Sequence, residues 1–270
     1  MTKRIGVLCF SPTNTTKIIC NAVALGMGEK NPQTSNITLP NIRAKITVDP
    51  NTATANIDHL VIGAPVYFGK LPVQFMDCLR LISGDGKECS AVVVYGNRDY
   101  GIALNQMVEI LRNNGFGVIA AGAFIGQHSY SDIVPVAIGR PDKSDREKAY
   151  SFGVNILRTS NYLSSKDVPI QKDILSKYDI YKPLKPVFVS KLCVQCGICA
   201  DHCPEGILLS DTGMYLSREA EKQCIGCMAC VFSCNNKARV AKANVILKLA
   251  MNMILKRASV ERQEPLTIFP

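Results

Sequence analysis

Several features common in other protein classes are missing from this chain of 270 residues. No stretch of 18 uncharged apolar residues occurs, so we expect no membrane-spanning helix. The apolar run near the N-terminus is too short for a secretion signal and suits a first strand instead. Tryptophan is absent, and only 22 acidic side chains stand against 31 basic ones. The 47% of hydrophobic residues is enough for a sizeable core. Twelve cysteines without a secretion signal indicate a reducing compartment, so a cytoplasmic location is expected.

Cysteine, by contrast, is abundant, and eight of the 12 cysteines form an internal repeat. Two runs share the spacing C-x2-C-x2-C-x3-C, and a shift of 31 positions places the first run on the second. The runs consist of Cys193, Cys196, Cys199 and Cys203, and of Cys224, Cys227, Cys230 and Cys234. Chance cannot plausibly produce this match. The remaining cysteines lie in apolar contexts and are expected to be buried thiols: Cys9, Cys20, Cys78 and Cys89.

The spacing within each run suits a cubane iron–sulfur cluster. Three thiolates two residues apart let one tight loop bind three irons, whereas a fourth thiolate three residues on is too far round to close the same cube. Residues 187–240 resemble bacterial two-cluster ferredoxins in this respect. The resemblance implies two 4Fe–4S clusters with crossed ligands, one on Cys193, Cys196, Cys199 and Cys234, the other on Cys224, Cys227, Cys230 and Cys203.

Zinc and disulfides are the alternative uses of these cysteines. Structural zinc usually takes paired C-x2-C knuckles, and disulfides belong to secreted proteins, of which the chain shows no sign. The second run departs from the ferredoxins, because Asn235 follows Cys234 where they have proline. Asn235 restores an N–H that Pro204 lacks in the first run, and an extra donor near a cluster shifts its potential.

The first 165 residues alternate apolar runs with helical patterns, which predicts an α/β fold with helices on both faces of a parallel five-stranded sheet. The expected strands are residues 3–9, 34–38, 59–63, 91–95 and 117–124. The expected helices are residues 18–27, 50–57, 73–82, 102–113 and 144–163. Ligands bind such sheets at the carboxyl ends of the strands, so the loops there are the candidate site.

Three of these loops have the composition of binding loops. The first places hydroxyls before a helix N-terminus, which suits an anion such as phosphate, although an ordinary N-capping loop is the alternative. It comprises Ser11, Pro12, Thr13, Asn14, Thr15 and Thr16. The second is aromatic and comprises Pro65, Val66, Tyr67, Phe68 and Gly69. The third contains Gly96, Asn97, Arg98 and Tyr100. His59 and His128 have no supporting motif, and we assign them no role.

These loops resemble those of flavodoxins, and the first is similar to their phosphate loop T/S-x-T-G-x-T. Asn14 replaces the glycine, and asparagine tolerates the left-handed conformation needed there. The resemblance implies bound FMN and the strand order 2-1-3-4-5. It implies that Tyr67 and Phe68 flank the ring, that Tyr100 stacks on its outer face, and that Asn97 and Arg98 donate to its pyrimidine edge. Gly69 would carry a peptide that moves when the flavin N5 gains a proton.

The whole chain resembles the flavodoxin–ferredoxin fusions of anaerobic bacteria and archaea. The implied organisation is a flavodoxin-like doubly wound domain (1–165), a linker (166–187), a small α+β ferredoxin domain (188–240), and a C-terminal helix and tail (241–270). The implied function is electron transfer between two 4Fe–4S clusters and FMN, which links one- and two-electron chemistry. An FMN-dependent reductase of a small substrate is one alternative, although no general acid is evident. A redox sensor is the other.

The positive charge is most concentrated in residues 237–257, with six basic side chains and no acidic one. Nucleic-acid binding is not expected, since a recognition motif and interleaved aromatic residues are both missing. We expect the charge to steer an acidic redox partner. Residues 240–257 have the pattern of an amphipathic helix. Docking on the protein itself is favoured over a membrane surface, because aromatic residues typical of interfacial helices are missing.

Overall fold

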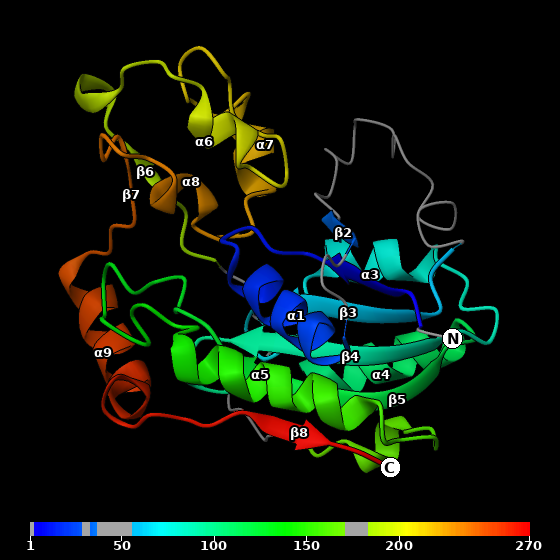
Figure 1. The fold of residues 1–270 in the computed structure, drawn as a ribbon. Coiled ribbons are helices and arrows are strands. Elements are labelled where there is room, and N and C mark those ends of the chain that lie inside the picture. The colour runs from blue at the N-terminus through cyan, green and yellow to red at the C-terminus, as the bar shows by residue number, and fades with distance from the viewer. Residues whose placement is uncertain (1–2, 29–32, 37–55, 171–182) are drawn as a thin grey trace.

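The computed structural model describes residues 3–28, 33–36, 56–170 and 183–270, which form two domains (Figure 1). The larger domain is built on a six-stranded sheet of order β2-β1-β3-β4-β5-β8. Its first five strands are parallel, which confirms the predicted order 2-1-3-4-5. The strands are β1 (Ile5–Cys9), β2 (Gln33–Asn36), β3 (His59–Pro65), β4 (Glu88–Tyr95), β5 (Gly117–Ile125) and β8 (Leu266–Ile268).

Two pairs of helices cover the two faces of this sheet (Figure 1). One face packs against α1 (Thr15–Gly26) and α5 (Lys143–Ile156), the other against α3 (Val73–Arg80) and α4 (Ala103–Asn113). Every residue of β3 and β5 is buried, as expected for parallel strands with both faces covered. Helices α1 and α5 approach so closely that a Cβ at Gly26 would lie 2.0 Å from the Tyr150 carbonyl oxygen. Glycine is therefore required at this contact.

The sixth strand was not predicted. Strand β8 pairs antiparallel with β5 and comes from the part of the chain expected to be a helix and tail. Three residues between Pro265 and Pro270 are too short to give a periodic signal. The phenyl ring of Phe269 packs 5.3 Å from that of Phe152 on α5, so the chain end is anchored on the first domain.

The smaller domain contains short elements around the cysteine runs. Strands β6 and β7 pair antiparallel, and the remaining elements are single helical turns. The elements are η3 (Ser190–Leu192), α6 (Ile198–Asp201), α7 (Arg218–Lys222), α8 (Ala229–Phe232), β6 (Val187–Phe188) and β7 (Arg239–Val240), with η1 (Ser165–Asp167) preceding the connection. The backbone repeats the sequence repeat: φ is positive at Gln195 and Gly226, at Gly197 and Met228, and at Gly206 and Lys237. Each pair is 31 positions apart, the same offset as the cysteines.

Helix α9 (Val245–Val260) then leads back to the larger domain. It begins at Val245 because the Asn244 side chain accepts a hydrogen bond from the Leu247 N–H at 2.8 Å. Its buried residues pack on Val134 and Val136, in the loop after β5. The favoured docking on the protein is therefore confirmed. In the part of the chain that the structure describes, helices long and apolar enough to span a membrane do not occur.

Other boundaries differ little from the predicted ones. The exception is α5, which was expected to reach residue 163 and ends at Ile156. The chain then turns back along the sheet, where the Leu163 N–H donates to the Val118 carbonyl at 2.7 Å. The helix predicted over residues 50–57 lies largely outside the described residues.

Candidate functional site

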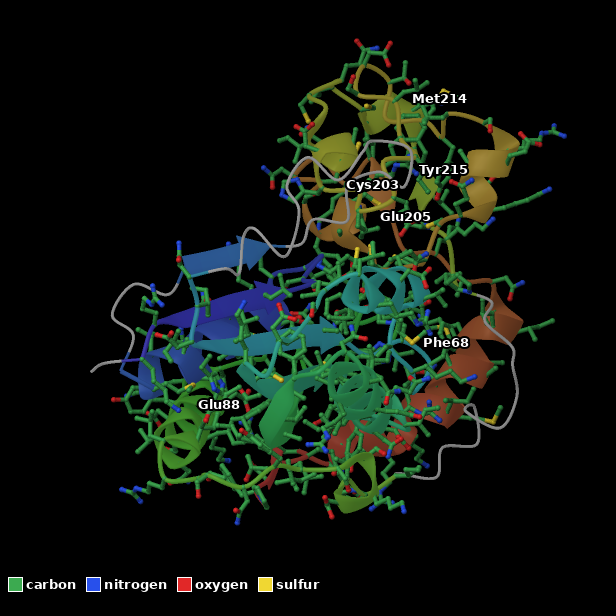
Figure 2. All side chains as sticks on the ribbon, turned by 90° about the vertical axis from the view of Figure 1, so that its right-hand side faces the viewer. Phe68, Glu88, Cys203, Glu205, Met214 and Tyr215 are labelled. Atoms are coloured by element: carbon green, nitrogen blue, oxygen red, sulfur yellow. The ribbon has the colours of Figure 1, made fainter. Side chains whose placement is uncertain are left out.

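The smaller domain brings together cysteines from both runs. Cys203 of the first run and Cys224, Cys227 and Cys230 of the second line one small apolar cavity. This is the crossed combination implied by the ferredoxin resemblance. Figure 2 shows Cys203 and Tyr215, another lining residue, within this domain.

The surroundings of these thiols suit metal-bound thiolates. Burial raises the pKa of Cys203, Cys227 and Cys230, the last to about 12, so free thiolates would be costly there. Backbone N–H groups nevertheless point at the sulfurs and lower the pKa of Cys203 and Cys227. Such donors are the usual partners of cluster sulfurs, so the residues fit a 4Fe–4S cluster.

Two of the other four cysteines, Cys193 and Cys234, have similar donors. The Gln195 N–H donates to Cys193 Sγ at 3.4 Å, and the Ala238 N–H to Cys234 Sγ at 3.2 Å. A Cβ at Gly213 would lie 3.2 Å from Cys199 Sγ and 4.0 Å from Cys193 Sγ. These two sulfurs are therefore neighbours, and only a glycine leaves room beside them.

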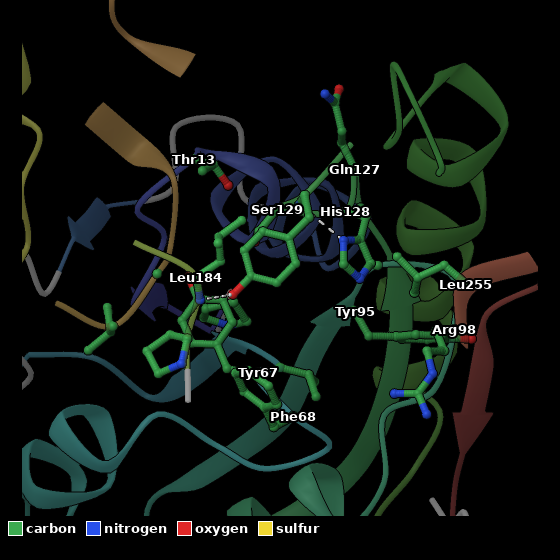
Figure 3. Close-up of a pocket in the computed structure, with 18 of the residues that line it drawn as sticks. Thr13, Tyr67, Phe68, Tyr95, Arg98, Gln127, His128, Ser129, Leu184 and Leu255 are labelled. Atoms are coloured by element: carbon green, nitrogen blue, oxygen red, sulfur yellow. Dashed lines mark hydrogen bonds between the residues drawn. The ribbon is translucent and has the colours of Figure 1, made fainter. Parts of the chain in front are cut away.

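A larger cavity of about 710 Å³ lies at the carboxyl ends of the strands, a size typical of a cofactor site (Figure 3). Eight of the predicted flavin-binding residues line it: Thr13, Thr15, Pro65, Val66, Tyr67, Phe68, Gly96 and Arg98. Seven do not line it: Ser11, Pro12, Asn14, Thr16, Gly69, Asn97 and Tyr100. The rest of the lining comes from the end of β4, the loop after β5, residues 183–185, the second cysteine run and α9.

The hydroxyl-rich loop is shaped to meet an anion. Asn14 has φ 64°, the left-handed conformation expected of the residue in the glycine position. The Ser11 hydroxyl accepts a hydrogen bond from the Lys17 N–H at 3.0 Å and so braces the loop. The Thr16 hydroxyl is buried without a hydrogen-bond partner among the described residues. A buried hydroxyl without a partner, beside the N-terminus of α1, is suited to donate a hydrogen bond to a phosphate oxygen.

The aromatic loop forms a tight turn. Phe68 and Gly69 both have positive φ, 54° and 73°, and Tyr67 and Lys70 exchange two backbone hydrogen bonds across them. The turn holds Tyr67 and Phe68 at the cavity (Figure 3). The Gly69 carbonyl accepts a hydrogen bond from the Ile102 N–H at 2.8 Å, which ties this peptide to the loop after β4 rather than to the cavity.

Two residues of the third loop have other partners than the predicted ones. The Asn97 amide donates to the carbonyls of Ala258 and Glu261, both at 2.7 Å, and its oxygen accepts from Arg140 Nη1 and the Gln263 N–H, both at 2.9 Å. All its hydrogen-bonding groups are thus used to anchor the C-terminal segment. The predicted role of Asn97 at the pyrimidine edge is therefore wrong in this structure.

Tyr100 is likewise not placed to stack on a ligand. Its ring is buried and lies edge-on to Tyr95, with 5.8 Å between centroids, and its hydroxyl donates to the Pro169 carbonyl at 3.2 Å. Tyr100 fills the core beneath the cavity, and Tyr95 lines the cavity instead.

Sequence reasoning missed the loop after β5, which contributes Tyr130 and His128 to the lining of the cavity; Figure 3 labels His128. Their rings are 5.6 Å apart, and His128 Nδ1 accepts a hydrogen bond from the Tyr130 N–H at 3.1 Å. The Tyr130 hydroxyl accepts one from the Leu184 N–H at 3.1 Å, so it ties this loop to the connection between the domains. Position alone could have identified this loop, because it follows a parallel strand at the same edge of the sheet.

We expect His128 to make folding stability depend on pH. Burial, with a smaller effect of the Arg98 charge, lowers the pKa of His128 to about 4. The unfolded chain gains this proton near pH 6.5, so stability is present above that pH and is lost as the pH falls towards 4. Relative to His128→Gln, the wild-type free energy of unfolding should fall by about 1.4 kcal/mol per pH unit in this window.

Urea unfolding of both proteins from about pH 7 to about pH 5 measures this difference. Replacement of the exposed His202 by glutamine is the matched control and should leave the pH dependence unchanged. A constant difference between wild type and His128→Gln across this range would show that His128 is not held neutral by the fold.

The two cavities share a residue. Ile225, between Cys224 and Cys227, lines both the four-cysteine cavity and the larger one, and Gly226 lines the larger one. A Cβ at Gly226 would lie 2.6 Å from Pro183 Cβ, so the cysteine loop packs directly on the connection between the domains. Nearby, Glu205 contacts Gln74 of α3, and burial raises the pKa of its carboxyl to about 7 (Figure 2).

This arrangement joins a flavodoxin-like α/β domain, with a parallel sheet of order 2-1-3-4-5, to a smaller domain built around two cysteine runs. Residues 185–235 match the family of 4Fe–4S dicluster domains. No curated protein matches the chain.

Several solved structures are similar to the larger domain. A flavodoxin from the domain Archaea is 19% identical, over 57% of this chain and 96% of that one, with a TM-score of 0.41. Oxidised flavodoxin 2 from Bacillus cereus is 15% identical, over 57% and 98%, with a TM-score of 0.43. The apo form of an NADH:FMN oxidoreductase is 17% identical, over 59% and 91%, with a TM-score of 0.41.

Proposed function

We propose that this protein transfers electrons between two 4Fe–4S clusters and an FMN held in the larger cavity. The observation that carries the proposal is Ile225, which lines both cavities, so the two sites share part of one wall. When bound, the clusters exchange single electrons and the flavin exchanges one or two. The protein residues hold these groups, orient them and exclude water.

Each cofactor has a set of residues suited to it. Cys203, Cys224, Cys227 and Cys230 would hold one cluster, and Cys193, Cys196, Cys199 and Cys234 the other. For FMN, the hydroxyl-rich loop and the N-terminus of α1 would hold the phosphate, and Tyr67 and Phe68 would flank the ring. Apolar side chains of α9, among them Met251 and Leu255, line the same cavity and limit access of water.

The charge of the chain suggests the kind of partner. Cys196 is exposed, and so is Lys191, five positions before it in the sequence. The cluster held by Cys193, Cys196, Cys199 and Cys234 would therefore be the entry point for electrons from a separate protein. We propose that this partner is acidic, since the net charge of +9 would steer such a protein at long range.

The alternative, a flavin reductase of a small substrate, needs a proton donor at the cavity. His128 is neutral near pH 7, because its pKa is lowered to about 4. Burial raises the pKa of Tyr130 to about 12, which makes it a weak acid. Neither group is tuned for proton transfer at neutral pH, so electron transfer is the better supported function.

Anaerobic reconstitution with iron, sulfide and FMN tests the proposal. We expect about eight irons per chain, from two four-iron clusters, and one FMN. The clusters give a broad visible absorption that bleaches on reduction, and metal analysis should find little zinc. Stoichiometric zinc with little iron would contradict the cluster assignment. Full iron content without FMN binding would leave a ferredoxin but contradict the flavin site.

A further inference from the structure

Arg239, the first residue of β7, is a charged side chain in an unusual position. It is only 1% exposed and is one of the largest fully buried side chains. One guanidinium nitrogen, Nη2, donates to the Gly213 carbonyl, whereas Nε and Nη1 are buried without a hydrogen-bond partner. Among the described residues, Arg239 forms no ion pair with a carboxylate. Burial of a guanidinium under these conditions is strongly unfavourable unless a negative charge compensates it.

The aromatic contacts of Arg239 compensate only a part of this cost. Its guanidinium carbon lies 5.3 Å from the ring centroid of Phe188 and 4.9 Å from that of Tyr215. Cation–π contacts fix the plane of the guanidinium and offer a modest attraction. They provide no acceptor for the N–H groups of Nε and Nη1.

The same neighbours place Arg239 between the two cysteine sets. Gly213, which accepts its hydrogen bond, lies against the sulfurs of Cys199 and Cys193. Tyr215, whose ring centroid lies 4.9 Å from the guanidinium carbon, lines the cavity formed by Cys203, Cys224, Cys227 and Cys230. The stacked Tyr215 ring therefore places the positive charge of Arg239 beside this cavity.

We propose that Arg239 is the internal counter-charge of the cluster held by Cys203, Cys224, Cys227 and Cys230, and that it raises the reduction potential of this cluster. The inference rests on the proposed function, since it requires the cluster. A four-iron cluster with four thiolates carries net negative charge, and one more negative charge is added on reduction. A fixed positive charge in a dry interior stabilises the reduced state more than the oxidised state. Arg239 would set the reduction potential of the cluster without contacting a substrate, since its contacts are Gly213, Phe188 and Tyr215.

Three variants of the full-length, reconstituted protein separate charge from packing. Arg239→Met keeps the apolar volume and removes the charge. Arg239→Lys keeps the charge and loses the planar stacking on Phe188 and Tyr215. Arg218→Met removes an exposed arginine of the same domain and serves as the control. The measurement is an anaerobic redox titration followed by electron paramagnetic resonance, together with iron content.

Arg239→Met should lower the reduction equilibrium constant of the crossed cluster at least tenfold, a shift of about 59 mV to more negative potential for one electron. The reduction potential of the cluster held by Cys193, Cys196, Cys199 and Cys234 should shift less. Arg239→Lys should keep most of the wild-type potential, and Arg218→Met all of it. If Arg239→Met binds less iron while Arg239→Lys loads fully, the charge is needed for cluster binding, which also supports the proposal.

Other outcomes would overturn it. If Arg239→Met titrates like the wild type, or loads iron as well as or better than Arg239→Lys without a shift, Arg239 has a packing role only. Equal shifts in the Met and Lys variants would likewise assign the effect to stacking. A wild-type protein without four-iron signals would overturn the proposed function together with this inference, and so is distinguishable from a failure of Arg239 alone.

Discussion

Cys203→Ala is expected to remove about half of the iron, leaving about four irons per chain, and to abolish the signal of the cluster held by the second run. Cys203 is in the first run by sequence, but it lines the cavity of Cys224, Cys227 and Cys230. Removal of one thiolate leaves a three-cysteine site with an open iron corner. Iron analysis and paramagnetic resonance of the reduced protein measure the loss. The cluster held by Cys193, Cys196, Cys199 and Cys234 should remain.

Cys78→Ala is the matched control, because Cys78 is a half-buried thiol on α3 that lines neither cavity. It should retain the full iron content. If Cys203→Ala loses the signal of the Cys193 set and keeps the other, the ligation is not crossed. The arrangement of the four-cysteine cavity would then have no role in cluster assembly.

The double variant Thr13→Val with Thr16→Val is expected to weaken FMN binding at least tenfold. Thr13 lines the cavity, and the Thr16 hydroxyl is buried without a partner. A hydrogen bond to a charged acceptor contributes roughly 1.5–3 kcal/mol, and about 1.4 kcal/mol is a factor of ten in affinity. Valine keeps the shape of threonine, so the loss reports on the hydroxyls. Fluorescence titration of the protein without flavin measures the affinity.

Riboflavin, which lacks the phosphate, separates this effect from a general loss of the cavity. Its affinity should be nearly unchanged in the double variant. Thr159→Val, at the distant end of α5, should change neither affinity. Asn14→Gly should bind FMN equally well or better, since glycine adopts the φ of 64° without strain. If the wild type binds FMN and riboflavin equally, the loop does not bind phosphate, and the flavin assignment loses its main support.

The parts of the fold that the sequence predicted are those set by local patterns. Apolar runs identified four of the five parallel strands, whereas the polar residues 34–38 gave only a weak signal for β2. The left-handed conformation of Asn14 followed from the resemblance of its loop to the flavodoxin phosphate loop, where the matching residue is glycine. The crossed cysteine set followed from the resemblance of the two runs to those of bacterial two-cluster ferredoxins. In each case the residues that decide the structure lie within a few positions of one another.

Asn97 and Tyr100 show where this reasoning stopped. The partners of the Asn97 side chain include Ala258 and Gln263, more than 160 positions along the chain. The Tyr100 hydroxyl donates a hydrogen bond to the carbonyl of Pro169, in the connection between the domains. A local motif could place both residues in a loop at the correct edge of the sheet. It could not show that distant segments would occupy their polar groups before any ligand does.

The return of strand β8 to the sheet changes how the two domains are related in chain order. The ferredoxin-like domain is an insertion within the flavodoxin-like domain, entered after α5 and left through α9, and it is not an appendage at one end. An appended domain can be cut away at a single linker. Removal of everything after residue 165 would here leave β5 as an open edge and the Asn97 amide without its carbonyl partners. Two covalent connections also restrict hinge motion between the domains, so the separation between the cavities depends on chain closure as well as on surface contacts.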